Sequence, residues 1–375
     1  MIYFDNAATT KPSATALSKA AEFNNENFFN PSALYRGGLY CNNALKTARS
    51  SVLRNLGLSE TKYEVVFTSC GSESDNNAIF GAVKRGVFVT DRGEHSAVIK
   101  CFIEQKNRNN TVFFCGLNKD GSVNENELLS LITDNRVDFV SIMHVNNETG
   151  AINDINALAN KIKSLNPNIV FHSDGVQAYG KIPVSLSNDI DLYSVSSHKI
   201  NGLKGTGALI KKKKLNLSPL VFGGGQENGQ RSGTENVFGI KVFEYAGKEH
   251  YSAIKENYVK VSEIKKYVTE NLDENLFSVI SGENCSPYIL SVSAVGVRGE
   301  VLMHMLENRN VIVGNGSACS AKNRYSRVIE ACGYPKDVLD GVIRVSFSVE
   351  NTLDEAKEFV KAANESAASL KRMMK

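Results

Sequence analysis

Short apolar runs alternate with longer segments of helical periodicity over most of the chain. An apolar run at residues 63–67 precedes a helical pattern at 72–84, and a second run at 87–90 precedes another helical pattern at 95–105. The same pattern continues with strands at 111–114, 138–143, 169–172, 191–195 and 207–210 and a helix at 154–165. Such alternation predicts an α/β fold in which helices cover a mostly parallel, seven-stranded sheet.

The pattern changes near residue 235. A long, charged helical stretch runs to about residue 275, and further elements follow: strands at 277–280, 288–292 and 343–347, a helix at 299–307 and a closing helix from 353. These elements predict a smaller α+β domain, and we expect the helix-rich first fifty residues to pack with it rather than with the sheet. We place the small domain at residues 1–15 and 236–375 and the large domain at 16–235.

Composition narrows the class of protein. The chain has 375 residues, 42% of them hydrophobic and 22% charged, which is enough for one large or two ordinary domains. The net charge of +3 is spread along the chain apart from one basic run at 211–214, which we expect to decorate a solvated turn, so we expect no nucleic-acid partner. The N-terminus has no basic leader or apolar signal, and no window approaches the roughly 20 apolar residues of a membrane span, which predicts a cytoplasmic protein without membrane contact.

Seven cysteines at 41, 70, 101, 115, 285, 319 and 332 form no CxxC pair, which favours neither a disulfide framework nor a metal site. Cys319 is unusual because no bulky side chain lies near it between Val313 and Lys322. This setting predicts a reactive thiol on a loop, whereas Cys101 and Cys115 have the apolar neighbours of core residues.

Polar clusters follow the predicted strands, at 70–76, 144–150, 173–177 and 196–199. Ligands of such sheets bind beyond the carboxyl ends of the strands, so these clusters are the candidate site. Pyridoxal phosphate requires a lysine for a Schiff base, an acid for its pyridine nitrogen and an anion-binding site for its phosphate. The candidates are Lys199 for the lysine, Asp174 with Gln177 for the ring, and Gly71, Ser72, Ser196, His198 and Thr234 for the phosphate.

Each candidate has a plainer interpretation. A lysine is usually a surface residue, and Lys204 competes with Lys199; Asp174 has the position of a helix N-cap. His95 begins a helix, where it can stack on a cofactor ring and move protons, although a lone histidine is more often structural. Arg344 stands in an apolar strand and needs an anion, either a substrate carboxylate or a buried Asp or Glu.

Ten motifs in order resemble the cysteine desulfurases, the NifS and IscS type of the fold-type I pyridoxal-phosphate enzymes. They are YFDNAATT (3–10), NPS (30–32), FTSCGSESDN (67–76), EHSAV (94–98), MHVNNETG (143–150), HSDGVQ (172–177), SSHK (196–199), RSGTEN (231–236), GSAC (316–319) and IRVSFS (343–348). They cover essentially the whole chain and together are highly specific. Three positions depart from the usual pattern: Ser72 replaces a threonine, Leu203 a proline and Asn315 a serine.

The resemblance implies a homodimeric transferase that converts L-cysteine to L-alanine and leaves a persulfide on Cys319. Lys199 would hold the cofactor, His95 would stack on it, Asp174 would bind the pyridine nitrogen and Gln177 the ring oxygen. The resemblance places Gly71, Ser72, Ser196 and His198 at the phosphate, Thr234 in the partner subunit's site, Asn147 beside the cofactor and Arg344 on the substrate carboxylate. The sulfur acceptor would serve iron–sulfur cluster assembly or a thiolation pathway.

Two other classes of protein remain open at this stage. A selenocysteine lyase or another class-V enzyme of the same fold could use the same residues, although an aminotransferase has no need of Cys319. A regulator that kept the fold without the chemistry is disfavoured because Lys199, Asp174 and Cys319 are all present.

Overall fold

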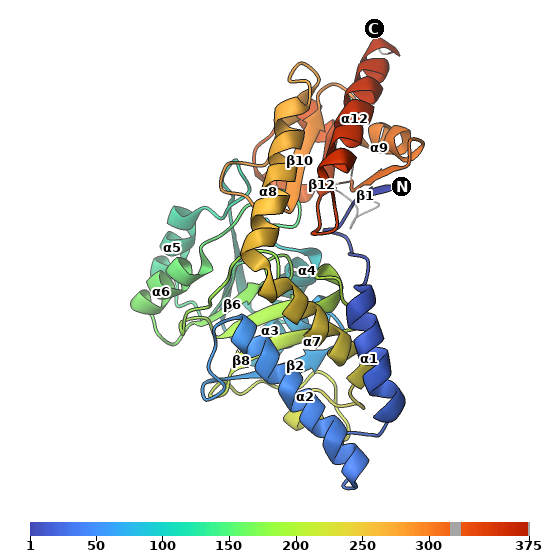
Figure 1. Cartoon of the computed structure of the whole chain (residues 1–375). Coiled ribbons are helices and arrows are strands. Elements are labelled where there is room, and N and C mark those ends of the chain that lie inside the picture. Colours follow the sequence, from blue (N-terminus) through green and yellow to red (C-terminus); the bar gives the residue numbers. More distant parts are fainter. Residues whose placement is uncertain (316–323, 374–375) are drawn as a thin grey trace.

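The computed structural model describes residues 1–315 and 324–373, and its centre is a seven-stranded sheet (Figure 1). Its strands are β2 (Tyr63–Thr68), β3 (Val87–Asp91), β4 (Thr111–Cys115), β5 (Phe139–Ser141), β6 (Val170–Asp174), β7 (Leu192–Ser196) and β8 (Gly207–Lys212). Their order across the sheet is β2-β8-β7-β6-β5-β3-β4, and only β8 runs antiparallel to its neighbours. The predicted α/β fold with a mostly parallel sheet is therefore confirmed.

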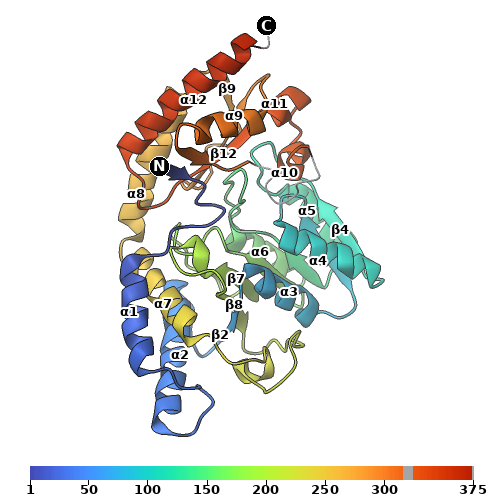
Figure 2. The same ribbon diagram turned by 90° about the vertical axis from the view of Figure 1, so that its right-hand side faces the viewer.

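Both faces of this sheet are buried, which explains the nearly continuous apolar strands. In β2, Val65 and Phe67 belong to one core and Val66 to the other, as the two-residue period of a strand requires. The core with Val66 is covered by α3 (Gly71–Ala82) and α4 (Ser96–Asn107), which Figure 2 shows together in front of the strands. The opposite core is covered by α2 (Arg36–Asn55), α5 (Glu125–Asp134), α6 (Ile155–Leu165) and α7 (Val237–Ser252).

A separate core lies in the C-terminal part of the chain, around the antiparallel sheet β12-β10-β9. Its elements are β9 (Phe277–Val279), β10 (Ile289–Ala294), β12 (Val342–Ser346), α8 (Ile254–Asn271), α9 (Gly299–Glu307), α10 (Arg327–Ala331), α11 (Lys336–Asp340) and α12 (Leu353–Met373). The N-terminal strand β1 (Ile2–Phe4) joins this part by pairing in parallel with β11 (Val311–Val313). No helix in the described ranges has the length and hydropathy needed to cross a membrane.

The expectation for the first fifty residues is wrong for both of their helices. Helices α1 (Ala14–Glu26) and α2 pack on α7, whose Ile240 and Phe243 belong to the core of the large sheet. Phe23 of α1 packs against that core, and α2 places Leu45 and Val52 in it. The helical stretch predicted from about 235 to 275 is also two helices, because Ala253 leaves helical geometry at φ −130°. The division into residues 16–235 and the remainder stays a proposal; these contacts would move its second boundary to the junction of α7 and α8.

The basic run at 211–214 is not simply a solvated turn. Lys211 is 2% exposed inside β8, and its Nζ lies 2.6 Å from Glu64 Oε1. Lys212 Nζ lies 2.8 Å from Asp191 Oδ1. Two of the four charges are thus neutralised within the fold, and Lys213 and Lys214 remain exposed at the turn.

Phe4 anchors the N-terminal strand. It is fully buried, and its ring meets those of Phe347 and Phe359 edge-on at centroid distances of 5.2 and 5.6 Å. Replacing Phe4 by alanine is expected to lower the free energy of unfolding by about 3–5 kcal/mol, because it removes a large core ring. Chemical denaturation measures this, with Val259→Ala on the exposed side of α8 as a control that should change stability by less than about 0.5 kcal/mol. Equal losses in the two variants would show that Phe4 does not hold β1 in place.

Candidate active site

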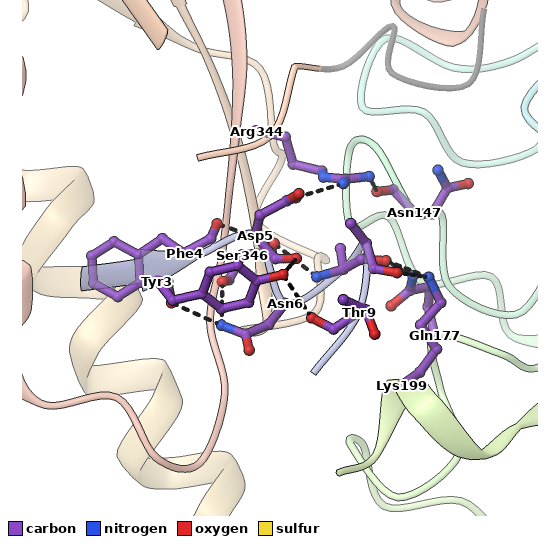
Figure 3. Close-up of polar contacts among 12 residues, drawn as sticks. Tyr3, Phe4, Asp5, Asn6, Thr9, Asn147, Gln177, Lys199, Arg344 and Ser346 are labelled. Carbon is purple, nitrogen blue, oxygen red and sulfur yellow. Dashed lines mark hydrogen bonds and ion pairs between the residues drawn. The ribbon is translucent and has the colours of Figure 1, made fainter. Parts of the chain in front are cut away.

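A cavity of about 400 Å³ lies between the large sheet and the C-terminal part of the chain, beyond the carboxyl ends of β6 and β7. The N-terminal segment contributes Ala7 and Ala8 to its wall, and the two sheets contribute residues such as Lys199 and Arg344. Figure 3 shows Lys199 and Arg344 reaching the N-terminal segment from opposite sides. Ten of the predicted site residues line it: Gly71, Ser72, His95, Asn147, Asp174, Gln177, Ser196, His198, Lys199 and Arg344. Thus most of the predicted site comes together in space.

Lys199 projects into the cavity from the single 3-10 turn that follows β7 (Figure 3). Its Nζ donates to the carbonyls of Ala7 and Ala8, at 2.6 and 2.8 Å. Gln177 Nε2 donates to the same Ala7 carbonyl at 2.9 Å, so the amine is held beside the predicted ring-binding residue. The competing Lys204 is exposed and does not line the cavity.

Asp174 ends β6 and is 4% exposed. Its Oδ1 accepts the Val176 amide at 2.9 Å and so stabilises a turn, whereas the N-cap interpretation would require a helix that does not follow. Burial raises the pKa of Asp174 to about 6, although the Val176 amide and Lys199 oppose the shift. A cation bound in the cavity, such as a protonated pyridine nitrogen, would stabilise the ionised carboxylate.

The first turn of α3 offers an anion site. Its N-cap residue Cys70 makes no side-chain cap, so the opening amide groups of the helix are available to a ligand. The buried Ser196 Oγ has no hydrogen-bond partner within the described ranges. A Cβ on Gly71 would stand 2.7 Å from Val176 Cγ2, so only glycine permits this close approach. These features fit the phosphate of pyridoxal phosphate.

His95 is the N-cap of α4, and its Nδ1 accepts the Ala97 amide at 3.2 Å. The proton of the neutral ring therefore sits on Nε2. Burial, together with the positive charges of Lys199, Arg327 and Arg344, lowers the pKa of His95 to about 4. The ring is neutral at pH 7, as an aromatic side chain that stacks on a cofactor and receives a proton should be.

Arg344 reaches the cavity from β12. Both partners expected for it from the sequence, an acidic residue and a substrate carboxylate, are compatible with its position. Its Nη2 lies 2.9 Å from Asp5 Oδ1, and its Nη1 donates to the Asn147 carbonyl at 2.8 Å (Figure 3). Its buried Nε has no hydrogen-bond partner in the part of the chain that the structure describes. The guanidinium is thus fixed by Asp5 and retains a donor for a substrate carboxylate.

Two predicted residues are not placed in this cavity. Thr234 lines a separate cavity of about 180 Å³ with Thr206, Glu227 and Arg231. Its predicted role in the site of a partner subunit remains a prediction. Cys319 lies outside the described residues, as does the rest of GSAC at 316–319.

The structure also adds residues that the sequence interpretation missed. Ala7 and Ala8 supply carbonyls to Lys199, and Glu148 and Asp75 line the cavity. Asp75 is almost fully buried on α3, where burial and the neighbouring Asp174 raise its pKa well above its usual value. An acidic residue on the apolar face of a predicted helix could have marked Asp75; the backbone carbonyls carried no sequence signal.

Comparisons with known proteins agree with this architecture. The model of the family described as aminotransferase class-V matches residues 2–359. The chain is 37% identical to a NifS/IcsS protein homolog of Lactobacillus delbrueckii subsp. bulgaricus, over 97% of each chain, and 35% identical to a cysteine desulfurase of Gluconacetobacter diazotrophicus, over 94% of this chain and 89% of that one. A solved NifS-like protein superimposes with a TM-score of 0.91 and 30% identity, covering 98% of this chain and 100% of the other.

Asp174→Asn is expected to change how stability depends on pH in the cofactor-free protein. The folded-state pKa of about 6 lies above the ordinary 3.8, so the folded protein holds the proton of Asp174 more tightly than the unfolded chain does. The stability that Asp174 contributes to the fold is therefore fully present below about pH 4 and is lost as pH rises through 6. Asparagine does not titrate, so the stability of the variant relative to the wild type should rise by about 1–2 kcal/mol from pH 5 to pH 8.

Denaturation at the two pH values measures this gain, and a separate titration with pyridoxal phosphate should show about 10–100-fold weaker binding to the variant. An equal stability difference at pH 5 and pH 8 would show that Asp174 is not the buried acid of this cavity.

Proposed function

The chain belongs to the aminotransferase class-V family, in its cysteine desulfurase group, and on this premise we propose that it transfers sulfur from L-cysteine to Cys319 with pyridoxal phosphate as cofactor. One observation carries the proposal: a single cavity brings together the Lys199 amine, the buried Asp174 carboxylate and the Arg344 guanidinium. A lysine and an acid suit a pyridine aldehyde, and an arginine with a spare donor suits an amino-acid carboxylate.

The residues of the cavity would hold the cofactor at three points. The amides that open α3 and the Ser196 hydroxyl would bind the phosphate, Asp174 would pair with the pyridine nitrogen, and Lys199 would bind the aldehyde carbon covalently. When bound, pyridoxal phosphate supplies an electron-withdrawing ring that makes loss of sulfur from the substrate feasible.

Side chains of this protein would bind the substrate, transfer protons and accept the sulfur. Arg344 binds the carboxylate of L-cysteine and fixes the orientation of its Cα–H bond. The Lys199 amine, displaced from the cofactor, takes the Cα proton, and the neutral His95 is placed to move a second proton. The Cys319 thiolate attacks the substrate sulfur, so the carbon–sulfur bond breaks, a sulfur–sulfur bond forms on Cys319, and protonation of the carbon fragment gives alanine.

A homodimer would complete the site. Six large apolar side chains are exposed between α1 and α2, on the first turns of α2 and on the loop after β8: Phe28, Leu34, Tyr35, Leu39, Tyr40 and Phe222. Exposed apolar side chains of this size and number are typical of a surface that a partner covers. A second subunit on this side would explain why Thr234 lies apart from the cavity of its own chain and would bring it to the partner's phosphate site.

The six cysteines in the described ranges are all free thiols, which supports a reducing compartment such as the cytoplasm. There the persulfide on Cys319 would pass to an acceptor protein of iron–sulfur cluster assembly or of a thiolation pathway.

Cys319→Ser is expected to abolish persulfide formation without preventing substrate binding, because serine keeps the size of the side chain but cannot accept sulfur. Wild-type protein mixed with L-cysteine and no reductant should form one equivalent of alanine and one persulfide on Cys319, located by mass spectrometry. The variant should still show the spectral change of cysteine binding and should make less than about 1% of that alanine in the same time. Alanine at the wild-type rate from the variant would refute the role of Cys319, and L-selenocysteine as the only accepted substrate would refute cysteine as the physiological one.

Mixed dimers test the partner contribution of Thr234. Lys199→Ala and Thr234→Ala subunits should each be weak alone, because one lacks the amine and the other weakens phosphate binding across the interface. A heterodimer of the two contains one intact site if Thr234 acts in the partner, so co-expressed and purified heterodimers should recover up to about half of the wild-type turnover. No recovery, with the dimer intact by light scattering, would place Thr234 in its own subunit's site.

A further inference from the structure

Both ends of the segment that carries Cys319 are attached at the cavity. Before the segment, the amide of Gly314 donates to the Arg344 carbonyl at 2.9 Å, and the Arg344 amide donates back at 2.8 Å. After the segment, the Ser326 hydroxyl donates to Glu148 Oε2. Arg344 and Glu148 both line the cavity, so the two attachments flank the place where substrate would bind.

Glu148 belongs to a turn that also contacts the substrate arginine. Asn146 Oδ1 accepts the amides of Glu148 and Thr149, each at 2.9 Å, and so holds the turn together. The carbonyl of Asn147, next to Glu148, accepts from Arg344 Nη1 at 2.8 Å. One turn thus joins the predicted carboxylate-binding residue to the exit of the Cys319 segment.

Arg327 provides a second attachment on the same side. Its Nη1 donates to the Arg92 carbonyl, and its Nη2 donates to the Glu94 carbonyl at 2.5 Å. Both carbonyls belong to the three residues before His95. Arg324, by contrast, makes an exposed ion pair with Asp340 at 2.9 Å and does not line the cavity, so it serves as a matched control.

The two attachments lie only a few residues from Cys319 along the chain. Cys319 lies five residues after Gly314 and seven before Ser326. A chain extends at most about 3.5 Å per residue, so Cys319 is confined to within about 18 Å of Gly314 and about 25 Å of Ser326. Loosening either attachment relaxes the limit that it sets.

We propose that Glu148 is a positioning residue for sulfur transfer, which holds the exit of the Cys319 segment at the rim of the cavity through Ser326. The sulfur-transfer step rests on the proposed function; the attachment itself does not. Glu148 need not touch substrate or cofactor for this role, since it acts through the hydroxyl that it accepts.

The test separates this attachment from the helix-capping role of Ser326, whose Oγ also accepts the Ile329 amide at 3.1 Å. Glu148→Ala leaves the cap intact, and Ser326→Gly keeps most of it because glycine is nearly as good an N-cap. Both variants should slow persulfide formation on Cys319 by on the order of tenfold, the effect of one lost hydrogen bond to a charged group. The spectral change on cysteine binding should keep its rate.

Three controls accompany these variants in the holoenzyme. Ser326→Thr keeps the hydroxyl and should restore the wild-type rate, and Arg324→Ala should leave it unchanged. The double variant Glu148→Ala with Ser326→Gly should be no slower than the slower single variant, because both changes remove the same contact.

Hydrogen exchange gives a readout that does not depend on catalysis. Deuterium uptake by the peptide covering residues 314–326 should rise in Glu148→Ala and Ser326→Gly at short labelling times, and not in Arg324→Ala. Unchanged uptake and unchanged persulfide formation would overturn the proposal, as would an equal slowing of the cysteine-binding spectral change. If the wild type forms no persulfide at all, the proposed function fails, and the exchange data still decide whether Glu148 holds the segment.

Discussion

The contact between the N-terminal segment at residues 5–10 and the Lys199 turn joins the two halves of this molecule. On one side, the N-terminal segment contacts two residues of β12: the Ala7 amide donates to Ser346 Oγ at 2.8 Å, and Asp5 pairs with Arg344. On the other side, the Ala7 carbonyl accepts Lys199 Nζ, and the Thr10 amide donates to the His198 carbonyl at 2.9 Å. The amine and the guanidinium therefore keep a fixed relation although they come from different sheets, as a site for a bifunctional amino acid requires.

Several ionisable groups are buried in this cavity or close to it, and their burial costs electrostatic free energy. Burial raises the pKa values of Asp75, Glu94 and Asp174, and burial together with the positive charges of Lys199 and Arg344 lowers that of Lys181 well below its usual value. Within the cavity, a cationic ring nitrogen would supply a partner for Asp174, and an anionic phosphate would supply one for the amides that open α3. The raised pKa of Asp174 in particular indicates a buried carboxyl that a bound cation would stabilise in its ionised form, as pyridoxal phosphate would.

Sequence periodicity predicted the large sheet well, because strands buried on both faces give continuous apolar runs that are hard to miss. It failed for α1 and α2, whose partner α7 lies two hundred residues away and left no local signal of which sheet they cover. The short strands β1 and β11 were also missed, since three residues give too little pattern. Ten site residues could be named because polar side chains at strand ends are visible in the sequence, whereas the carbonyls of Ala7 and Ala8 and the contact of Glu148 with Ser326 arise only in the folded chain.

The claim on which the whole account depends is that Lys199, rather than another lysine, carries the cofactor. Borohydride reduction of the purified holoenzyme fixes pyridoxal phosphate to the lysine that holds it, and peptide mass spectrometry then locates the modified residue. The account predicts a single modified peptide with the cofactor on Lys199. Modification at Lys181 or Lys204, or a protein that binds no pyridoxal phosphate, would contradict it.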